Sequence, residues 1–295
     1  MSDVVPHDDI VLSGRLDRDV VMRSLVNHSV PGVERIDPVA GTVTRLVRTA
    51  SGVAPVAVDI RAEGVAVRGA ADPETVELVR EWFDLDTDLD RITRAFDPDP
   101  VLGPLVRERP AVRVIGHPDG FEAAVQTVLG QQVSLAACRT FTGRLALAYG
   151  SPGADGLIEF PDAAIVAAAE LEELRAAVGI PLARARTVIA LAGAFASGLR
   201  IGRSSDPGAV RAELLALPGI GPWTVDYLAL RVLRDPDAYP VGDLVLRRAL
   251  GGVSPAEALE LGERWRPWRA YATMHLWTAD AAGTSGASSV RTSGG

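Results

Sequence analysis

Apolar and polar residues alternate along much of the N-terminal part of the chain. This period of two is typical of strands with one buried and one solvated face, and it predicts an antiparallel sheet. A helix expected from about Glu74 to Phe83 would cover the buried face. The alternating segments are 43–48, 56–61 and 65–68, with turns at Ser51-Gly52 and Glu63-Gly64.

Beyond residue 88 the apolar spacing lengthens to three and four residues, which predicts helices joined by short Gly/Pro-marked loops. Asp119 is placed to cap a long helix from Phe121 to about Tyr149. We therefore expect an N-terminal α/β domain at 1–88, a helical domain at 89–282 and a disordered tail at 283–295. Further helices are expected near 162–178, 183–197, 207–215, 223–232, 244–250, 255–265 and 267–279.

Composition indicates a globular protein. The chain has 295 residues, 47% of them apolar and 23% charged, and can bury a substantial core. Its first residues are acidic where a secretory signal would be basic, and the longest uncharged apolar run, Thr187 to Leu199, is too short to span a bilayer. The single cysteine, Cys138, excludes internal disulfides and four-thiolate metal sites. We expect a cytoplasmic monomer, in a bacterial-type cytosol, with no membrane contact.

The charge balance argues against a nucleic-acid partner when it is taken alone. The net charge is −8, whereas phosphate neutralisation dominates nucleic-acid affinity. A binding face needs only local positive groups and oriented amides, however, so the global sum does not exclude one. All 30 basic residues are arginine, and the absence of lysine limits the available chemistry.

The segment Leu217-Pro218-Gly219-Ile220-Gly221-Pro222-Trp223-Thr224 lies between two expected helices. Glycines allow a close backbone approach that a β-carbon resists, so Ile220 can insert between the helices while bare amides point outward. Amides at the start of a helix, reinforced by the helix dipole, bind phosphate without side-chain cations. The alternative is a glycine-rich turn that only packs two helices together.

The whole hairpin string resembles the helix-hairpin-helix of the DNA glycosylase superfamily. The stretch from Phe121 to Ser134 resembles the helix and DNA-inserting loop of that superfamily. The stretch from Arg264 to Trp277 is similar to the C-terminal signature of the 3-methyladenine DNA glycosylase II family. The resemblance implies a mainly α fold of two helical subdomains around a cleft, preceded by a small α/β domain with an antiparallel sheet.

This resemblance also implies how the hairpin would hold DNA. The amides of Gly219, Gly221 and Thr224 would bind one strand through its backbone. Gln132 would stand at the wedge position that fills the vacated base stack, where the best-studied type of the family has leucine. No cofactor is required, but hairpin carbonyls would hold a structural Na⁺ or K⁺. By position those carbonyls belong to Leu215, Leu217 and Ile220.

Asp243 is the candidate catalytic residue. It follows Pro240-Val241-Gly242, lies about twenty residues after the hairpin as the family pattern requires, and opens an apolar helix. Taken locally, an aspartate at such a position is an N-cap. Read together with the hairpin, it is a carboxylate that can stabilise the oxocarbenium-like charge of glycosidic cleavage and guide a water. Asp226 and Asp237 compete for this role, but one lies within a helix and the other in the preceding loop.

Aromatic residues supply the candidate base pocket. Trp223 and Tyr227 are four residues apart and share a helix face. Aromatics at that spacing are commonly core residues; beside a phosphate-binding hairpin they also suit a flat cationic base. The resemblance adds Trp277 as a pocket wall and Leu244, which follows the aspartate, as its neighbour.

Two further departures from the family pattern, and one difference from its bifunctional relatives, bear on function. Bifunctional relatives have a lysine, which forms a Schiff base, at the position of Trp223, so no lyase activity is expected here. Leu244 replaces a tyrosine. Where the family adds an N-terminal aromatic to the pocket, only Ser24, Leu25 or their neighbours are available.

These observations predict a monofunctional DNA glycosylase that excises alkylated purines, of the 3-methyladenine and 7-methylguanine type, from damaged duplex DNA in base excision repair. Leu244 and Gln132 keep open an alternative in which the same fold acts on deaminated bases such as hypoxanthine or uracil. The acidic composition keeps open a second, a non-catalytic damage-binding DNA module.

Overall fold

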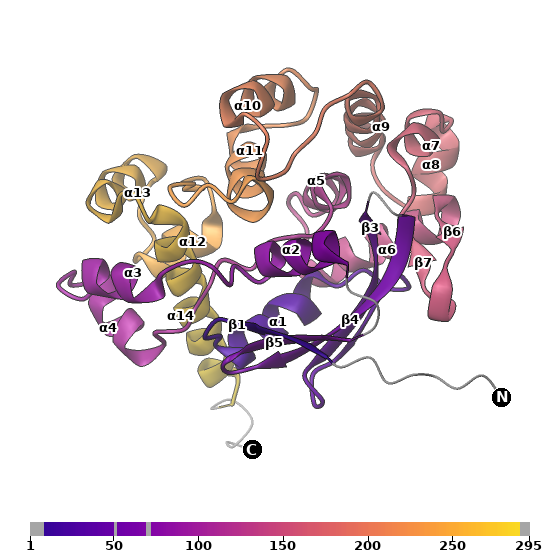
Figure 1. Cartoon of the computed structure of the whole chain (residues 1–295). Helices are drawn as coiled ribbons and strands as arrows, with labels where there is room; N and C mark the ends of the chain where they lie inside the picture. Colours follow the sequence, from indigo (N-terminus) through magenta and orange to yellow (C-terminus); the bar gives the residue numbers. More distant parts are fainter. Residues whose placement is uncertain (1–8, 50–51, 69–71, 290–295) are drawn as a thin grey trace, which may run out of the picture.

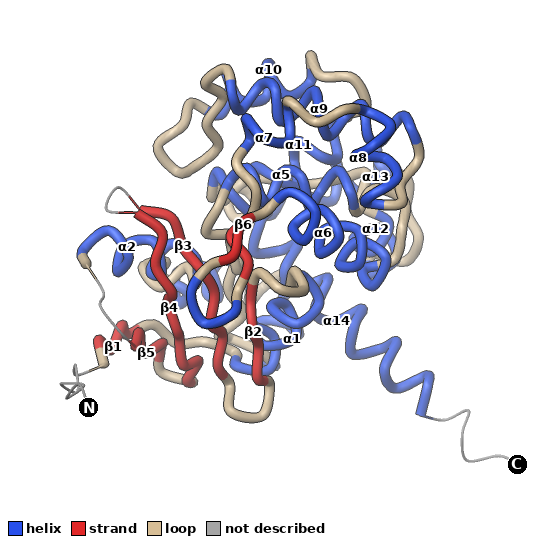
Figure 2. Tube along the Cα trace, turned by 90° about the vertical axis from the view of Figure 1, so that its right-hand side faces the viewer, coloured by secondary structure: helices blue, strands red, loops and turns tan. Residues whose placement is uncertain are grey.

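The computed structural model describes residues 9–49, 52–68 and 72–289, with side chains described up to residue 282. Its N-terminal part is a five-stranded antiparallel sheet with strand order β1-β5-β4-β3-β2 (Figure 2). The predicted sheet is confirmed. The strands β1 and β2 were not predicted, because each has only four residues, too few for a clear alternation. The strands are β1 (Ile10–Ser13), β2 (Glu34–Asp37), β3 (Thr42–Thr49), β4 (Gly52–Arg61) and β5 (Gly64–Arg68).

Two helices cover the apolar face of this sheet. The helix α2 (Pro73–Trp82) was predicted, and the Asp72 side chain caps it by accepting from the Thr75 N–H. The helix α1 (Arg18–His28) was not predicted. Buried residues of both helices pack in one cluster with inward-facing valines of the strands, so the sheet and its helices share a core.

The helical part of the chain contains two further cores. One core is formed by the consecutive helices α5 through α11, and the other by α3, α4, α12 and α14. The two groups of helices lie on different sides of the molecule (Figure 1). The helices are α3 (Leu89–Phe96), α4 (Leu102–Glu108), α5 (Gly120–Leu129), α6 (Leu135–Tyr149), α7 (Ala163–Ala167), α8 (Leu171–Val178), α9 (Leu182–Ala196), α10 (Pro207–Leu215), α11 (Pro222–Leu228), α12 (Leu244–Ala249), α13 (Pro255–Gly262) and α14 (Arg269–Ser289).

The single helix expected from Phe121 to Tyr149 is in fact two helices, α5 and α6. The chain turns between them because Gln132 has a left-handed φ of 55° and Ser134 caps α6 by accepting from the Ala137 N–H. Local periodicity could not reveal this break, since apolar spacing continues on both sides of it.

Three other predicted boundaries change. The helix expected at 162–178 divides into α7 and α8, and the one expected at 255–265 ends in a 3₁₀ turn at Glu263–Trp265. The last helix, α14, continues to Ser289, so the first part of the segment expected as a disordered tail is helical. Residues 290–295 of that segment lie outside the described residues.

Across the described ranges, no single helix has the length and hydropathy to cross a membrane. By those two criteria alone, α8 and α9 pass only as a pair, and that pair is bent by 113°.

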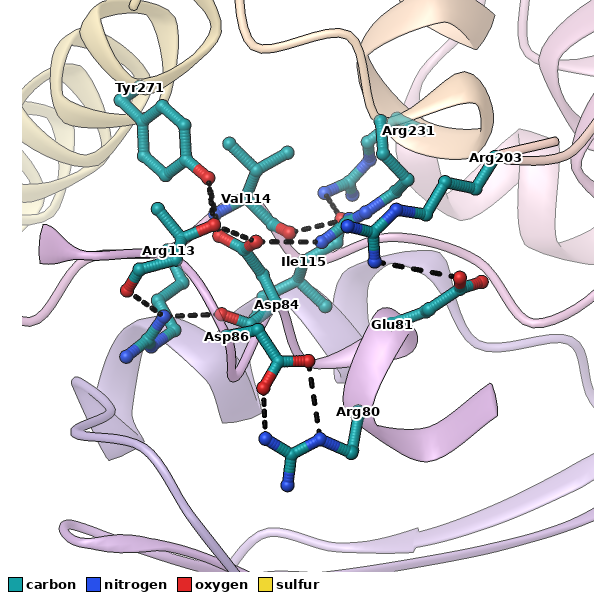
Figure 3. A network of polar contacts seen from close by, with 12 residues as sticks. Arg80, Glu81, Asp84, Asp86, Arg113, Val114, Ile115, Arg203, Arg231 and Tyr271 are labelled. Atoms are coloured by element: carbon teal, nitrogen blue, oxygen red, sulfur yellow. Dashed lines mark hydrogen bonds and ion pairs between the residues drawn. The ribbon is translucent and has the colours of Figure 1, made fainter. Parts of the chain in front are cut away.

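A polar network joins the N-terminal part of the chain to the helical part (Figure 3). At its centre Asp84, in a left-handed conformation after α2, accepts hydrogen bonds from the Tyr271 hydroxyl of α14 (2.8 Å) and from Thr87 (2.7 Å). The guanidinium of Arg234 forms an ion pair with the same carboxylate at 3.2 Å. Because hydrogen bonds are directional, this network fixes how the two parts of the chain meet.

The lowered pKa values of two buried histidines predict how the stability of the protein depends on pH. Burial lowers the pKa of His275, on α14, from 6.5 to about 4, although Asp17 opposes the shift. As the pH falls below 6.5, His275 binds a proton in the unfolded chain but stays neutral in the folded chain. The folded state therefore loses stability towards pH 4. Burial also lowers the pKa of His28, to about 3, so His28 has the same effect on stability as His275. Burial raises the pKa of Glu34, so Glu34 has the opposite effect and favours the folded state as the pH falls.

We expect the unfolding free energy of wild type to fall between pH 6.5 and pH 5 more steeply than that of His275→Gln. One proton corresponds to about 1.4 kcal/mol per pH unit, so the difference between the two proteins should change by roughly 1–2 kcal/mol over this interval. Urea unfolding followed by circular dichroism measures it. Parallel curves for the two proteins would contradict a neutral buried imidazole.

Candidate active site

The hairpin between α10 and α11 has the geometry expected from its sequence. Ile220 is only 7% exposed and packs into the core that joins α5 to α11. Gly219 has a φ of +81°, and a β-carbon there would lie 2.2 Å from Oγ1 of Thr187 on α9. Only glycine fits this position, because both the backbone conformation and the neighbouring side chain exclude a larger residue.

The hairpin also leaves backbone groups unpaired. In the part of the chain that the structure describes, the N–H groups of Gly219, Gly221 and Thr224 donate to no protein acceptor. Gly221 begins α11 as its N-cap, and a β-carbon on it would meet no atom within 4 Å. These three amides remain the predicted phosphate contacts.

The predicted cation ligands are carbonyl oxygens of the same turn, those of Leu215, Leu217 and Ile220. Neutral oxygens suit a hard cation, and the Leu217 carbonyl also accepts from the Ile220 N–H at 3.3 Å. No group of three or more His, Cys, Asp or Glu side chains within the described residues could hold a metal ion. Na⁺ or K⁺ binding at the hairpin therefore stays a prediction.

Asp243 is an N-cap, one of the two roles predicted for it, and its carboxylate also contacts predicted pocket aromatics. Its Oδ1 accepts from the Leu246 N–H at 2.8 Å and so caps α12. The same oxygen accepts from Nε1 of Trp277 at 2.9 Å, and Oδ2 accepts from Nε1 of Trp223 at 3.1 Å. The cap and the two indole N–H groups hold the half-buried carboxylate in one orientation.

The three predicted pocket aromatics form one cluster around this carboxylate. Trp223 and Tyr227 stack with their ring centres 5.4 Å apart, and Tyr227 lies 6.1 Å from Trp277. All three rings are half-buried rather than part of the fully buried core. The cluster therefore joins α11 of one helical core to α14 of the other.

Leu244 and Gln132 both lie on the surface. Leu244 follows Asp243 and is 70% exposed. Gln132 is exposed at the tip of the loop between α5 and α6. Its neighbour Gln131 donates to the hairpin, which places the predicted wedge loop beside the predicted backbone contacts.

The competing aspartates are engaged elsewhere. Asp226 accepts from Arg211 of α10 at 2.7 Å, and burial raises its pKa while Arg211 opposes that shift. Asp237 forms ion pairs with Arg266 and Arg269. Asp243, by contrast, has no ion pair among the described residues and is the aspartate that contacts the indoles.

A polar cavity beside Tyr227 was not predicted. Its lining includes Ser24, Leu25 and His28 of α1 together with Arg231, whose guanidinium lies 5.7 Å from the Tyr227 ring centre. Arg231 is 7% exposed and donates to the Ile115 carbonyl and to Oγ of Ser24. Burial, followed by Arg231, lowers the pKa of His28 to about 3, so this imidazole is neutral near pH 7.

Known proteins share this architecture and sequence. Residues 14–119 match the AlkA N-terminal domain, and residues 125–261 match the HhH-GPD superfamily base excision DNA repair protein. The DNA-3-methyladenine glycosylase of Bacillus subtilis is 33% identical over 218 residues, which cover 69% of this chain and 71% of that protein. DNA-3-methyladenine glycosylase 2 of Escherichia coli is 38% identical over 179 residues, or 60% and 63% of the two chains.

A relative in Mycobacterium tuberculosis, a probable bifunctional transcriptional activator/DNA repair enzyme AlkA, is 44% identical over 68% of this chain; the match spans 41% of that longer protein. The 3-methyladenine DNA-glycosylase of Archaeoglobus fulgidus superposes with a TM-score of 0.80 at 19% identity, covering 93% of this chain and 99% of that one. The chain belongs to the HhH-GPD superfamily of base excision DNA repair proteins and, within it, to the family of the AlkA-type 3-methyladenine DNA glycosylases.

The hairpin glycines give a stability test that is independent of activity. Gly219→Ala adds a β-carbon in a left-handed conformation and against buried Thr187, so it should cost about 2 kcal/mol or more. Gly221→Ala meets no atom and loses only the slight preference for glycine at an N-cap, less than about 1 kcal/mol. Denaturant unfolding of both variants measures the difference; equal costs would contradict the described hairpin.

Proposed function

We propose that this chain is a monofunctional DNA glycosylase that excises alkylated purines, of the 3-methyladenine and 7-methylguanine type, from damaged duplex DNA in base excision repair. The observation that carries the proposal is the Asp243 carboxylate, held by two indole N–H groups in a half-exposed aromatic cluster. The family of the chain and the hairpin beside this cluster support it.

Binding begins with the DNA backbone. The unpaired amides of Gly219, Gly221 and Thr224 bind phosphate oxygens, which is why an acidic chain needs few basic side chains at this surface. Gln132 enters the duplex as the damaged nucleotide leaves it. The extruded base stacks on the aromatic rings, and each stacked base contributes about 1–3 kcal/mol.

Chemistry then requires one carboxylate. As the glycosidic bond breaks, positive charge develops on the sugar, and a fixed Asp243 stabilises this charge without reorganising. The indole donors hold its two oxygens, so the carboxylate stays oriented towards the sugar and guides the attacking water. An N-methylated purine is already cationic and leaves without a general acid.

Substrate range is the second question for this site. The wall beside Tyr227 contains Ser24 and a buried arginine in place of an aromatic ring, and Leu244 is exposed. Such a polar wall favours, as a second candidate activity, excision of deaminated bases such as hypoxanthine. Oligonucleotides that each carry one lesion, 7-methylguanine, hypoxanthine or uracil, separate the two activities.

We further propose that the enzyme acts as a cytoplasmic monomer. It requires no catalytic metal. The carbonyls of Leu215, Leu217 and Ile220 would hold Na⁺ or K⁺ when the hairpin is bound to a phosphate, and the ion would supply positive charge beside that phosphate. Dependence of DNA affinity on the identity of the monovalent salt would report it.

Asp243→Asn tests the catalytic role. Asparagine also caps helices, so the start of α12 should be kept while the negative charge is removed. We expect the release of methylated purines from duplex DNA treated with dimethyl sulfate to fall by about 100-fold or more. Asp226→Asn, which alters an aspartate paired with Arg211, is the matched control and should stay close to wild type.

Two results would contradict the proposal. Undiminished release by Asp243→Asn removes this residue from the reaction. Lesion-dependent binding by wild type without any released base over long incubation would instead identify a non-catalytic damage-binding module.

Strand cleavage tests the monofunctional assignment. The chain has no lysine, and Trp223 occupies the position of the Schiff-base lysine, so products should be abasic sites that break only after alkali. Borohydride should trap no covalent protein–DNA adduct. Strand breaks at neutral pH, or a trapped adduct, would contradict this expectation.

A further inference from the structure

The side chain of Gln131 hydrogen-bonds the loop between α5 and α6 to the hairpin. Its amide Nε2 donates to the Gly219 carbonyl at 3.1 Å and to Oγ1 of Thr224 at 3.0 Å. Both acceptors belong to residues whose N–H groups are the proposed phosphate contacts. The next residue in the loop, Gln132, is the proposed wedge.

The helix α9 supports both partners from the other side. Arg184 donates from Nη2 to the backbone carbonyl of Gln131 at 2.6 Å. Three residues further along α9, Thr187 lies against Gly219, which has no room for a β-carbon. Residues separated by three positions lie on the same helix face, so one face of α9 supports both the loop and the hairpin.

The conformation of Gln132 requires such support. It is a non-glycine residue with a φ of 55°, a conformation that costs about 1–3 kcal/mol and persists where surrounding contacts determine it. Its own side chain is exposed. Gln131 contributes contacts to both neighbours of the loop, through its side-chain amide and its carbonyl, in addition to the hydrogen bond from the Val133 N–H to the Gly130 carbonyl.

We propose that Gln131 is a positioning residue that couples the proposed phosphate contacts of the hairpin to the wedge residue, Gln132. The inference rests on the proposed function. While the hairpin amides hold the DNA backbone, the side-chain amide of Gln131 fixes the distance between the hairpin and Gln132. The wedge then enters the base stack at the nucleotide being extruded. Misplacement by about 1 Å can cost a large rate factor even when no reacting group is changed.

The choice of glutamine follows from the two acceptors. A carbonyl oxygen and a hydroxyl oxygen lie within reach of Nε2, and a primary amide supplies two N–H donors to them. Glutamate has the same shape but would oppose its carboxylate oxygen to the Gly219 carbonyl. Methionine keeps the length and loses both hydrogen bonds.

The test compares paired with mispaired lesions in single-turnover excision by Gln131→Met. A lesion in a normal base pair leaves the stack only with the help of the wedge, whereas a mispaired lesion is already partly unstacked. We expect about a tenfold loss on the paired lesion and a much smaller loss on the mispaired one. Gln131→Glu should behave like Gln131→Met, and Thr140→Ala, on the exposed face of α6, is the control.

A second measurement does not depend on base release. The fluorescence of 2-aminopurine placed next to an abasic analogue in duplex DNA reports unstacking by the bound protein. Gln131→Met should lower the fluorescence rise severalfold at saturating protein, with an unchanged urea midpoint of unfolding or a small shift only.

Equal losses on both lesions, or a wild-type fluorescence rise in Gln131→Met, would overturn the inference. If wild type unstacks the probe but releases no base, the proposed function fails while the fluorescence comparison still decides the role of Gln131. A double-variant cycle with Thr224→Val should be non-additive; additive losses would count against direct coupling.

Discussion

The site depends on one carboxylate held by three donors that come from different parts of the chain. The backbone of α12 fixes Asp243 as an N-cap, and the indoles of Trp223 on α11 and Trp277 on α14 fix its two oxygens. Because α11 and α14 belong to different helical cores, the carboxylate is oriented only when both cores are in place. Its geometry therefore reports the packing of the whole helical region.

The proposed function is compatible with an acidic composition. The proposed phosphate contacts, the amides of Gly219 and Gly221, would use backbone dipoles that do not enter the net charge of −8. Two arginines near the site are engaged inside the protein: Arg184 donates to the loop before α6, and Arg231 donates to Ile115 and Ser24. Under the proposed function, the number of basic side chains would not measure how well this surface binds DNA.

Sequence periodicity predicted the central strands and most helices because each signal is local. It merged α5 with α6, since the left-handed Gln132 interrupts an apolar pattern that continues on both sides. The hairpin and Asp243 could be found from their residue types and spacing. The contacts of Gln131 with Thr224, and of Arg231 with Ser24, join residues 93 and 207 positions apart, and no local pattern encodes such pairs.

The place of α1 has a consequence for how such an enzyme can diversify. This helix packs on the N-terminal sheet, yet Ser24 and Leu25 face the cavity beside Tyr227, while Asp243 belongs wholly to the helical region. Under the proposed function, α1 would contribute to base selectivity, whereas the reaction would depend on a residue of the helical region. Under the proposed function, exchange of a few side chains on α1 would alter which bases are accepted and leave Asp243 and its indole donors in place.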